Sequence, residues 1–255
     1  MARALPFIGV VALLAGVAPA WAGAGHTLEV RFADGKTVFV QKVGLEEGRQ
    51  VNFAGPVTGR DGTRRQAIIN ALLSADSGAF ELQYQLELSG DAGGSSIQGQ
   101  GDAMMRSKDS VTAVQCRRWR IDLTLDGSKR EGDKGTAWDP SGLGNLRVTA
   151  ELSAGQERLT CRQVLKPGVQ GNVLDSLRMG DERFGLVMSM LPVPSLHANT
   201  IDLQYQLSYT PLRAPVRAFQ AQSQQTLTPG RKSVSETSGY KLELTVEGGR
   251  PSKTK

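Results

Sequence analysis

Residues 80–86 read FELQYQL and residues 201–207 read IDLQYQL, so five consecutive residues recur at a spacing of 121. At the same spacing, IDLTLDG at 121–127 is matched by LELTVEG at 242–248, where every difference is conservative. Two independent matches at one spacing indicate tandem copies of one structural unit. Weaker matches extend the repeat, namely Leu28–Val30 with Leu146–Val148, LEEGRQVN (45–52) with LKPGVQGN (165–172), and Gln98 and Gln100 with Gln220 and Gln222.

These matches define the expected domain organisation. We expect copy 1 at residues 24–127 and copy 2 at residues 145–248. The segment between them, 128–144, is rich in glycine and charge, which predicts a linker or a long loop. The last residues, 249–255, are polar and basic, which predicts a disordered tail.

Apolar and polar side chains alternate within each copy. The alternation runs through 82–88 and again through 203–209, and each copy ends on a similar segment, at 119–125 and at 240–246. A period of two is typical of antiparallel strands with one buried face. We therefore expect the tyrosines of the repeated Gln-Tyr-Gln in the core and its glutamines in solvent. The alternative is that the two glutamine faces meet in a polar seam between the copies.

Further segments have strand character and are separated by breaks rich in glycine, proline and serine. QAIINALL, at 66–73, would suit a short helix, but its counterpart FGLVMSML is flanked by glycine and proline, so we interpret both as strands. Six to eight strands in about 100 residues predict an all-β fold of two tandem, small antiparallel β-sandwiches, with a barrel as the alternative. The other expected strands are 27–32, 37–43, 49–54, 146–152, 157–164 and 184–190.

Composition sets limits on the class of protein. The chain has 255 residues, of which 39% are hydrophobic, 5% aromatic and 22% charged. It is too polar for a protein with many membrane spans and too apolar for a wholly disordered one. Only 2 cysteines are present, which excludes a zinc module with four cysteine ligands.

Residues 1–22 have the pattern of a secretory signal peptide. Arg3 precedes an apolar stretch from Leu5 to Val17, and Ala20-Trp21-Ala22 forms a cleavage site of the small-x-small type. The alternative is a membrane anchor, but the apolar stretch is shorter than the roughly 20 residues that a spanning helix needs. We therefore expect a periplasmic or secreted protein that does not span the membrane after processing. Because an exported protein rarely meets nucleic acid, we expect no nucleic-acid partner despite the net charge of +5.

Cys116 precedes the last segment of copy 1, and Cys161 lies early in copy 2. Neither has a cysteine counterpart in the other copy, so a bond between them would join the two copies. In an oxidising compartment such a pair is more often bonded than free. Closing the intervening loop would contribute roughly 4 kcal/mol in the chain-entropy model. We predict a disulfide between Cys116 and Cys161.

The sequence carries no catalytic signature: the nucleophile elbow, the zinc-protease motif, the Walker loop and the EF-hand loop are all missing. His26 and His197 are isolated, so no metal site and no cofactor are predicted. Arg117, Arg118 and Arg120 form the strongest basic cluster and are a candidate surface for an anionic partner. Solvated charges that protect the edge of a sheet explain these arginines equally well.

These observations favour a non-catalytic function. We predict an exported protein of the bacterial envelope that acts in protein interaction or assembly, because duplicated β-modules present loops and sheet edges to partners. Its partner would be an envelope or secreted protein. The alternative is a soluble periplasmic carrier that holds a small or anionic ligand in the cleft between the copies. An enzyme with a site of scattered acids is the third possibility.

Overall fold

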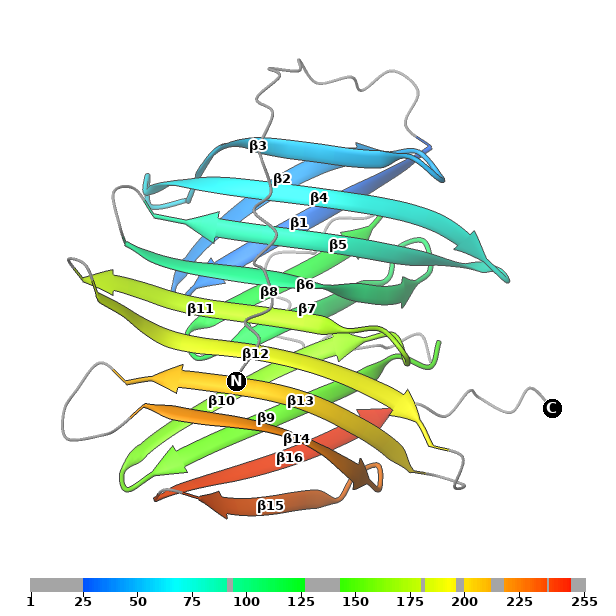
Figure 1. Ribbon diagram of the computed structural model, residues 1–255. Coiled ribbons are helices and arrows are strands. Elements are labelled where there is room, and N and C mark those ends of the chain that lie inside the picture. The colour runs from blue at the N-terminus through cyan, green and yellow to red at the C-terminus, as the bar shows by residue number, and fades with distance from the viewer. Residues whose placement is uncertain are drawn as a thin grey trace, which may run out of the picture.

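The computed structural model describes residues 25–90, 94–126, 143–179, 182–195, 200–211, 218–237 and 239–248. The described residues form sixteen β-strands in two antiparallel sheets of eight strands. The sheets lie face to face in two layers whose strands cross at an angle (Figure 1). The prediction of an all-β sandwich is therefore confirmed.

Each predicted copy contributes eight strands. In copy 1 they are β1 (His26–Asp34), β2 (Thr37–Leu45), β3 (Gln50–Thr58), β4 (Arg64–Asp76), β5 (Ala79–Ser89), β6 (Ser95–Met105), β7 (Ser110–Cys116) and β8 (Trp119–Leu125). In copy 2 they are β9 (Leu146–Ala154), β10 (Glu157–Leu165), β11 (Gly171–Met179), β12 (Glu182–Pro194), β13 (Ile201–Thr210), β14 (Phe219–Leu227), β15 (Lys232–Thr237) and β16 (Tyr240–Gly248).

The two copies are joined edge to edge, so both sheets run through the whole molecule. Sheet 1 has the order β15-β16-β9-β10-β7-β8-β1-β2, and sheet 2 has the order β14-β13-β12-β11-β6-β5-β4-β3. Copy 2 supplies the first four strands of each sheet, and copy 1 repeats their order in the last four. Strand β10 pairs with β7, and β11 pairs with β6. The copies are thus halves of one double-layered sandwich, stacked one above the other in Figure 1.

The alternation in the sequence predicts the core correctly. Leu82, Tyr84 and Leu86 of β5 are buried, whereas Gln83 and Gln85 are exposed. The equivalent strand β13 shows the same division. The glutamines therefore lie on the outer face of sheet 2, and they do not form a seam between the copies. The segments 66–73 and 184–190, which we interpret as strands, lie within β4 and β12.

One detail of the repeat is corrected by the hairpin turns. The first hairpin of copy 1 pairs Asp34 with Thr37 around Gly35, whose φ is 61°. The first hairpin of copy 2 pairs Ala154 with Glu157 around Gly155, whose φ is 58°. Both glycines adopt the left-handed conformation that glycine tolerates best. Matching the two turns gives a spacing of 120 between the copies. Leu28–Val30 therefore aligns with 148–150 and not with Leu146–Val148.

Some predictions fall on residues outside the described ranges. These are the signal peptide at 1–22, nearly all of the linker at 128–144, and the tail at 249–255. Within the ranges that the structure describes, no helix has the length and hydrophobicity needed to cross a membrane.

Candidate functional site

The junction between the copies brings the two cysteines together. Cys116 of β7 lies directly opposite Cys161 of β10, and both side chains are fully buried. Residues that face each other across an antiparallel pair have Cα atoms about 4.5–5.5 Å apart, which is within the range of a disulfide. Both thiols are free in this structure. Burial, together with the hydrogen bond to Cys116, raises the pKa of Cys161, which disfavours the use of the Cys161 thiol as a nucleophile.

Three glycines of sheet 2 allow the two sheets to approach closely at this junction, and the contact at Gly101 also crosses from copy 1 to copy 2. A Cβ atom added to Gly99 would lie 2.7 Å from Cγ2 of Val114, and one added to Gly101 would lie 2.8 Å from Cδ2 of Leu165. A Cβ atom at Gly171 would also collide with Leu165. The junction is therefore packed as a continuous core, and the copies are not separated by a cleft at this level.

Polar groups inside the junction are bonded across it. The Nε2 group of Gln163 in β10 donates to the carbonyl of Gln100 in β6 at 2.6 Å. The Tyr84 hydroxyl of β5 donates to the carbonyl of Val164 in β10 at 3.4 Å. Burial raises the pKa of Tyr84, so the phenol stays protonated and keeps its donor. These bonds fix the register of one copy against the other.

Arg117, Arg118 and Arg120, which form the basic cluster in the sequence, pair with three different carboxylates. Arg117 reaches Asp175 of copy 2, with Nη1 3.3 Å from Oδ2. Arg118 pairs with Asp34, with Nε 2.7 Å from Oδ1, and its guanidinium stacks on the Trp119 ring. Arg120 pairs with Asp122, with Nε 2.8 Å from Oδ1. The structure does not gather the three side chains at one ligand position, and an interaction surface formed by them stays a prediction.

Arg117 instead joins arginines of copy 2 around an open hollow at the junction. The hollow has a volume of about 390 Å³ and is also lined by Arg158 and Arg162 of β10. Arg162 donates from Nη1 to Oε1 of Gln115 at 3.4 Å, and Arg158 pairs with Glu151 at 2.9 Å. This cluster is not visible in the sequence, because two of its arginines lie more than 40 residues after Arg117. Such a group of guanidinium ions suits an anion.

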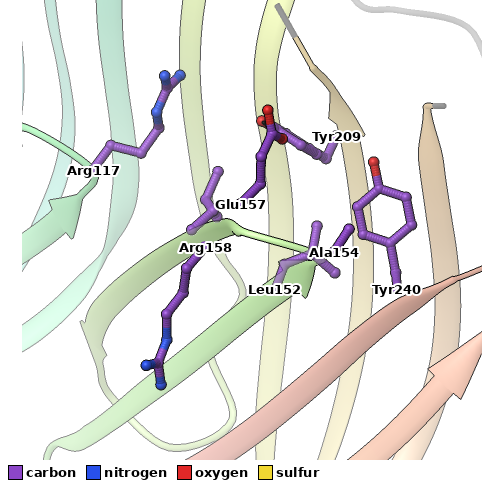
Figure 2. A pocket seen from close by; sticks show the side chains of 8 residues that line it. Arg117, Leu152, Ala154, Glu157, Arg158, Tyr209 and Tyr240 are labelled. Atoms are coloured by element: carbon purple, nitrogen blue, oxygen red, sulfur yellow. Dashed lines mark hydrogen bonds between the residues drawn. The ribbon is translucent and has the colours of Figure 1, made fainter. Parts of the chain in front are cut away.

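A second pocket, of about 200 Å³, lies between the sheets at one end of copy 2. Figure 2 shows the Glu157 carboxylate beside the Tyr209 phenol, Tyr240 of β16 further along the pocket, and Arg158 directed away from them. Tyr209 donates to Oε2 of Glu157 at 3.3 Å. Burial and the nearby Glu157 raise the pKa of both tyrosines, which disfavours their use as bases or nucleophiles.

The outer face of sheet 2 carries a continuous row of amide and hydroxyl side chains, which we name the amide row. One residue from each strand belongs to it, and each lies opposite the next in register. None of its members is buried. From β3 to β14 the members are Asn52, Asn70, Gln85, Gln100, Asn172, Ser189, Gln206 and Gln222.

The described residues show no constellation typical of metal chemistry. No group of three or more His, Cys, Asp or Glu side chains within them is arranged to hold a metal ion. The His26 ring lies 2.7 Å from Oδ2 of Asp126 at Nδ1, which is a bond between strand β1 and the residue after β8. His197 lies outside the described residues.

Comparisons with known proteins add no functional assignment. The chain matches no protein-family model, and no curated protein or solved structure resembles it significantly.

Proposed function

We propose that this chain is an exported, non-catalytic protein that binds an envelope or secreted protein through the free edges of its sheets. The observation that carries the proposal is the open strand order: among the described residues, β2 and β15 end sheet 1, and β3 and β14 end sheet 2. Edge strands offer unpaired backbone groups to another chain, and strand addition is a common mode of protein recognition.

Features of these edges support selective rather than indiscriminate pairing. Strand β3 contains Pro56, which cannot donate a backbone hydrogen bond. Lys42 of β2 and Lys232 and Glu236 of β15 place charges on the two edges of sheet 1. Charges and proline limit the registers and partners that an edge accepts.

Photo-cross-linking tests this proposal. A photoreactive residue is introduced at Ala54 of β3 or Gln220 of β14, and the producing cells are irradiated. Gln204 is the matched control, since it is exposed on the same face but belongs to the interior strand β13. We expect protein adducts from the two edge positions and few from Gln204. Equal labelling at all three positions, or none at the edges, would contradict edge binding.

A second candidate function is the binding of an anionic ligand, favoured by the hollow that Arg117, Arg158 and Arg162 line between the copies. Calorimetric titration with inorganic phosphate and with a linear polyphosphate tests it. Arg162→Gln should weaken binding, whereas Arg49→Gln, which removes an exposed arginine elsewhere, should not. Equal effects of both substitutions would indicate general attraction to the basic protein.

We also infer that Cys116 and Cys161 form a disulfide after export. Their opposed, buried positions support it. The two thiols would together give up two protons and two electrons to an oxidised thiol–disulfide oxidoreductase, whose own disulfide is thereby reduced. Mass spectrometry of the mature protein, unfolded and alkylated without reductant, should detect no alkylated cysteine. Two alkylated cysteines would refute the bond.

A further inference from the structure

The internal junction joins two different surfaces, one from each copy. The equivalent of each surface lies at one end of the sandwich. Copy 2 docks with β10 and β11 on β7 and β6 of copy 1. The strands equivalent to β10 and β11 are β2 and β3, which form one free end of the sandwich. The strands equivalent to β6 and β7 are β14 and β15, which form the other free end. A head-to-tail contact between chains would therefore repeat the internal junction.

The hairpins fix which residues are equivalent in sheet 1. The spacing of 120 derived above relates β2 to β10. The turn between β7 and β8 pairs Cys116 with Trp119, and the turn between β15 and β16 pairs Thr237 with Tyr240, so a spacing of 121 relates β7 to β15. Applied to the residue pairs of the internal junction, these spacings predict which residues would face each other between the free ends of two molecules.

The transferred register sets opposite charges against each other. At the internal junction Arg162 lies opposite Gln115, and their side chains are hydrogen-bonded. The equivalent residues at the free ends are Lys42 and Glu236. Facing residues of opposite charge stabilise an antiparallel pair, so at this position the free ends carry opposite charges where the internal junction pairs an arginine with a glutamine.

In sheet 2 a repeated side-chain bond confirms the alignment. Nε2 of Gln50 lies 3.0 Å from Oδ1 of Asn52 at the start of β3. Nε2 of Gln170 lies 3.2 Å from Oδ1 of Asn172 at the start of β11. The same bond in both copies shows that β3 and β11 are related by the spacing of 120.

The amide row would continue from one chain into the next. At the internal junction Asn172 lies opposite Gln100, and both belong to the row. The spacing of 122 that relates β6 to β14 makes Gln222 the counterpart of Gln100. Asn52 of one chain would then face Gln222 of the next, and these are the two terminal members of the row.

Side-chain sizes are also complementary in this register. Phe53 of β3 would face Ala221 of β14, which places a large side chain against a small one. Two positions on, Gly55 would face Phe219, with the sizes reversed. Pro56 follows Gly55, but its partner would precede the first residue of β14, so the proline falls outside the pairing.

We propose that the partner at these edges is a second copy of this chain, with β2 and β3 of one molecule paired to β15 and β14 of the next. This proposal rests on the proposed edge-binding function and names its partner. Each added molecule would extend both sheets by eight strands, or about 38 Å at the usual strand spacing. Because Ser233 and Ser235 line the inner side of β15, the contact is polar and reversible, with its extent set by concentration.

Disulfide trapping tests the transferred register directly. The positions equivalent to Cys161 and Cys116 are Gln41 and Thr237, so the double variant Gln41→Cys/Thr237→Cys should form intermolecular disulfides when diamide oxidises the purified mature protein. The control is Val40→Cys/Val234→Cys on the same two strands. These residues are 39% and 51% exposed but lie four residues out of register.

We expect a ladder of covalent oligomers from the first variant on non-reducing gels and little from the control. Equal ladders would mean random collision, and no ladder from either would overturn the register.

Sedimentation velocity of the unsubstituted mature protein should show mass rising with concentration, and Lys42→Glu should weaken this association about fivefold. Glu236→Lys added to Lys42→Glu should restore it. A strict monomer at every concentration would refute self-association. Edge-specific photo-adducts with another protein would then leave the edge-binding function intact.

Discussion

Gly101→Ala should destabilise the protein because the added methyl group has no space at the junction between the copies. The new Cβ atom would lie 2.8 Å from Cδ2 of Leu165, 3.1 Å from the Tyr84 hydroxyl oxygen and 3.2 Å from Nε2 of Gln163. Overpacking of a core costs about 1–3 kcal/mol. The reduced entropy of the unfolded chain returns about 0.4–1 kcal/mol. The midpoints of these ranges give a net loss of about 1.3 kcal/mol, or about 3–5 °C in Tm for a chain of this size.

Urea titration and scanning calorimetry of the mature protein at low concentration measure this loss. Gly55→Ala is the matched control, because Gly55 lies in a strand at the free edge and its added Cβ would meet only the Phe53 ring, at 3.4 Å. That substitution should leave the free energy of unfolding unchanged or slightly higher. If Gly101→Ala were as stable as the unsubstituted protein, the close packing of the two copies would be wrong.

Two further predictions concern the same junction. Burial and the neighbouring Glu81 raise the pKa of Asp102 from 3.8 to about 6, so the folded state binds this proton more tightly than the unfolded state. Stability from this group is present below pH 3.8 and declines as pH rises to about 6. Asp102→Asn should thus raise Tm at pH 7 and change it little at pH 3.5, which thermal melts across pH would show; a larger gain at low pH would contradict the sign. Tyr84→Phe removes the hydroxyl bond to Val164 and should lower the free energy of unfolding by about 1 kcal/mol in urea, whereas an unchanged midpoint would show that the bond contributes nothing.

The sequence predicts the fold best where burial imposes a regular pattern. The alternation around Tyr84 and Tyr205 identifies interior strands, since each must bury one face and expose the other. Strand β6 was not predicted, because Gly99 and Gly101 are residues typical of loops. In the structure these glycines leave space for side chains of β7 and β10. Strand β15, KSVSET, escaped because an edge strand buries little and needs no apolar pattern.

The candidate site was only partly predictable. The pairing of the cysteines could be predicted from their number, which is two, and from the expected export to an oxidising compartment. The fold places Cys116 opposite Cys161. The hollow around Arg117 could not be predicted from the sequence. Arg158 and Arg162 lie beside Arg117 only because β10 pairs with β7. Similarly, the spacing of 121 reveals a duplication, but not that the copies share both sheets. That arrangement depends on which strand edges meet, and edge pairing leaves little trace in a single sequence.

Hydrogen–deuterium exchange at several protein concentrations tests most directly whether the internal junction is repeated between chains. We predict slow exchange at every concentration where the junction strands are paired on both sides, which is at 95–100 of β6, 114–116 of β7, 161–163 of β10 and 172–177 of β11. In β2, β3, β14 and β15, exchange should be fast in dilute solution and should slow as concentration rises. Fast exchange in the four junction strands, or edge strands whose exchange ignores concentration, would contradict the account.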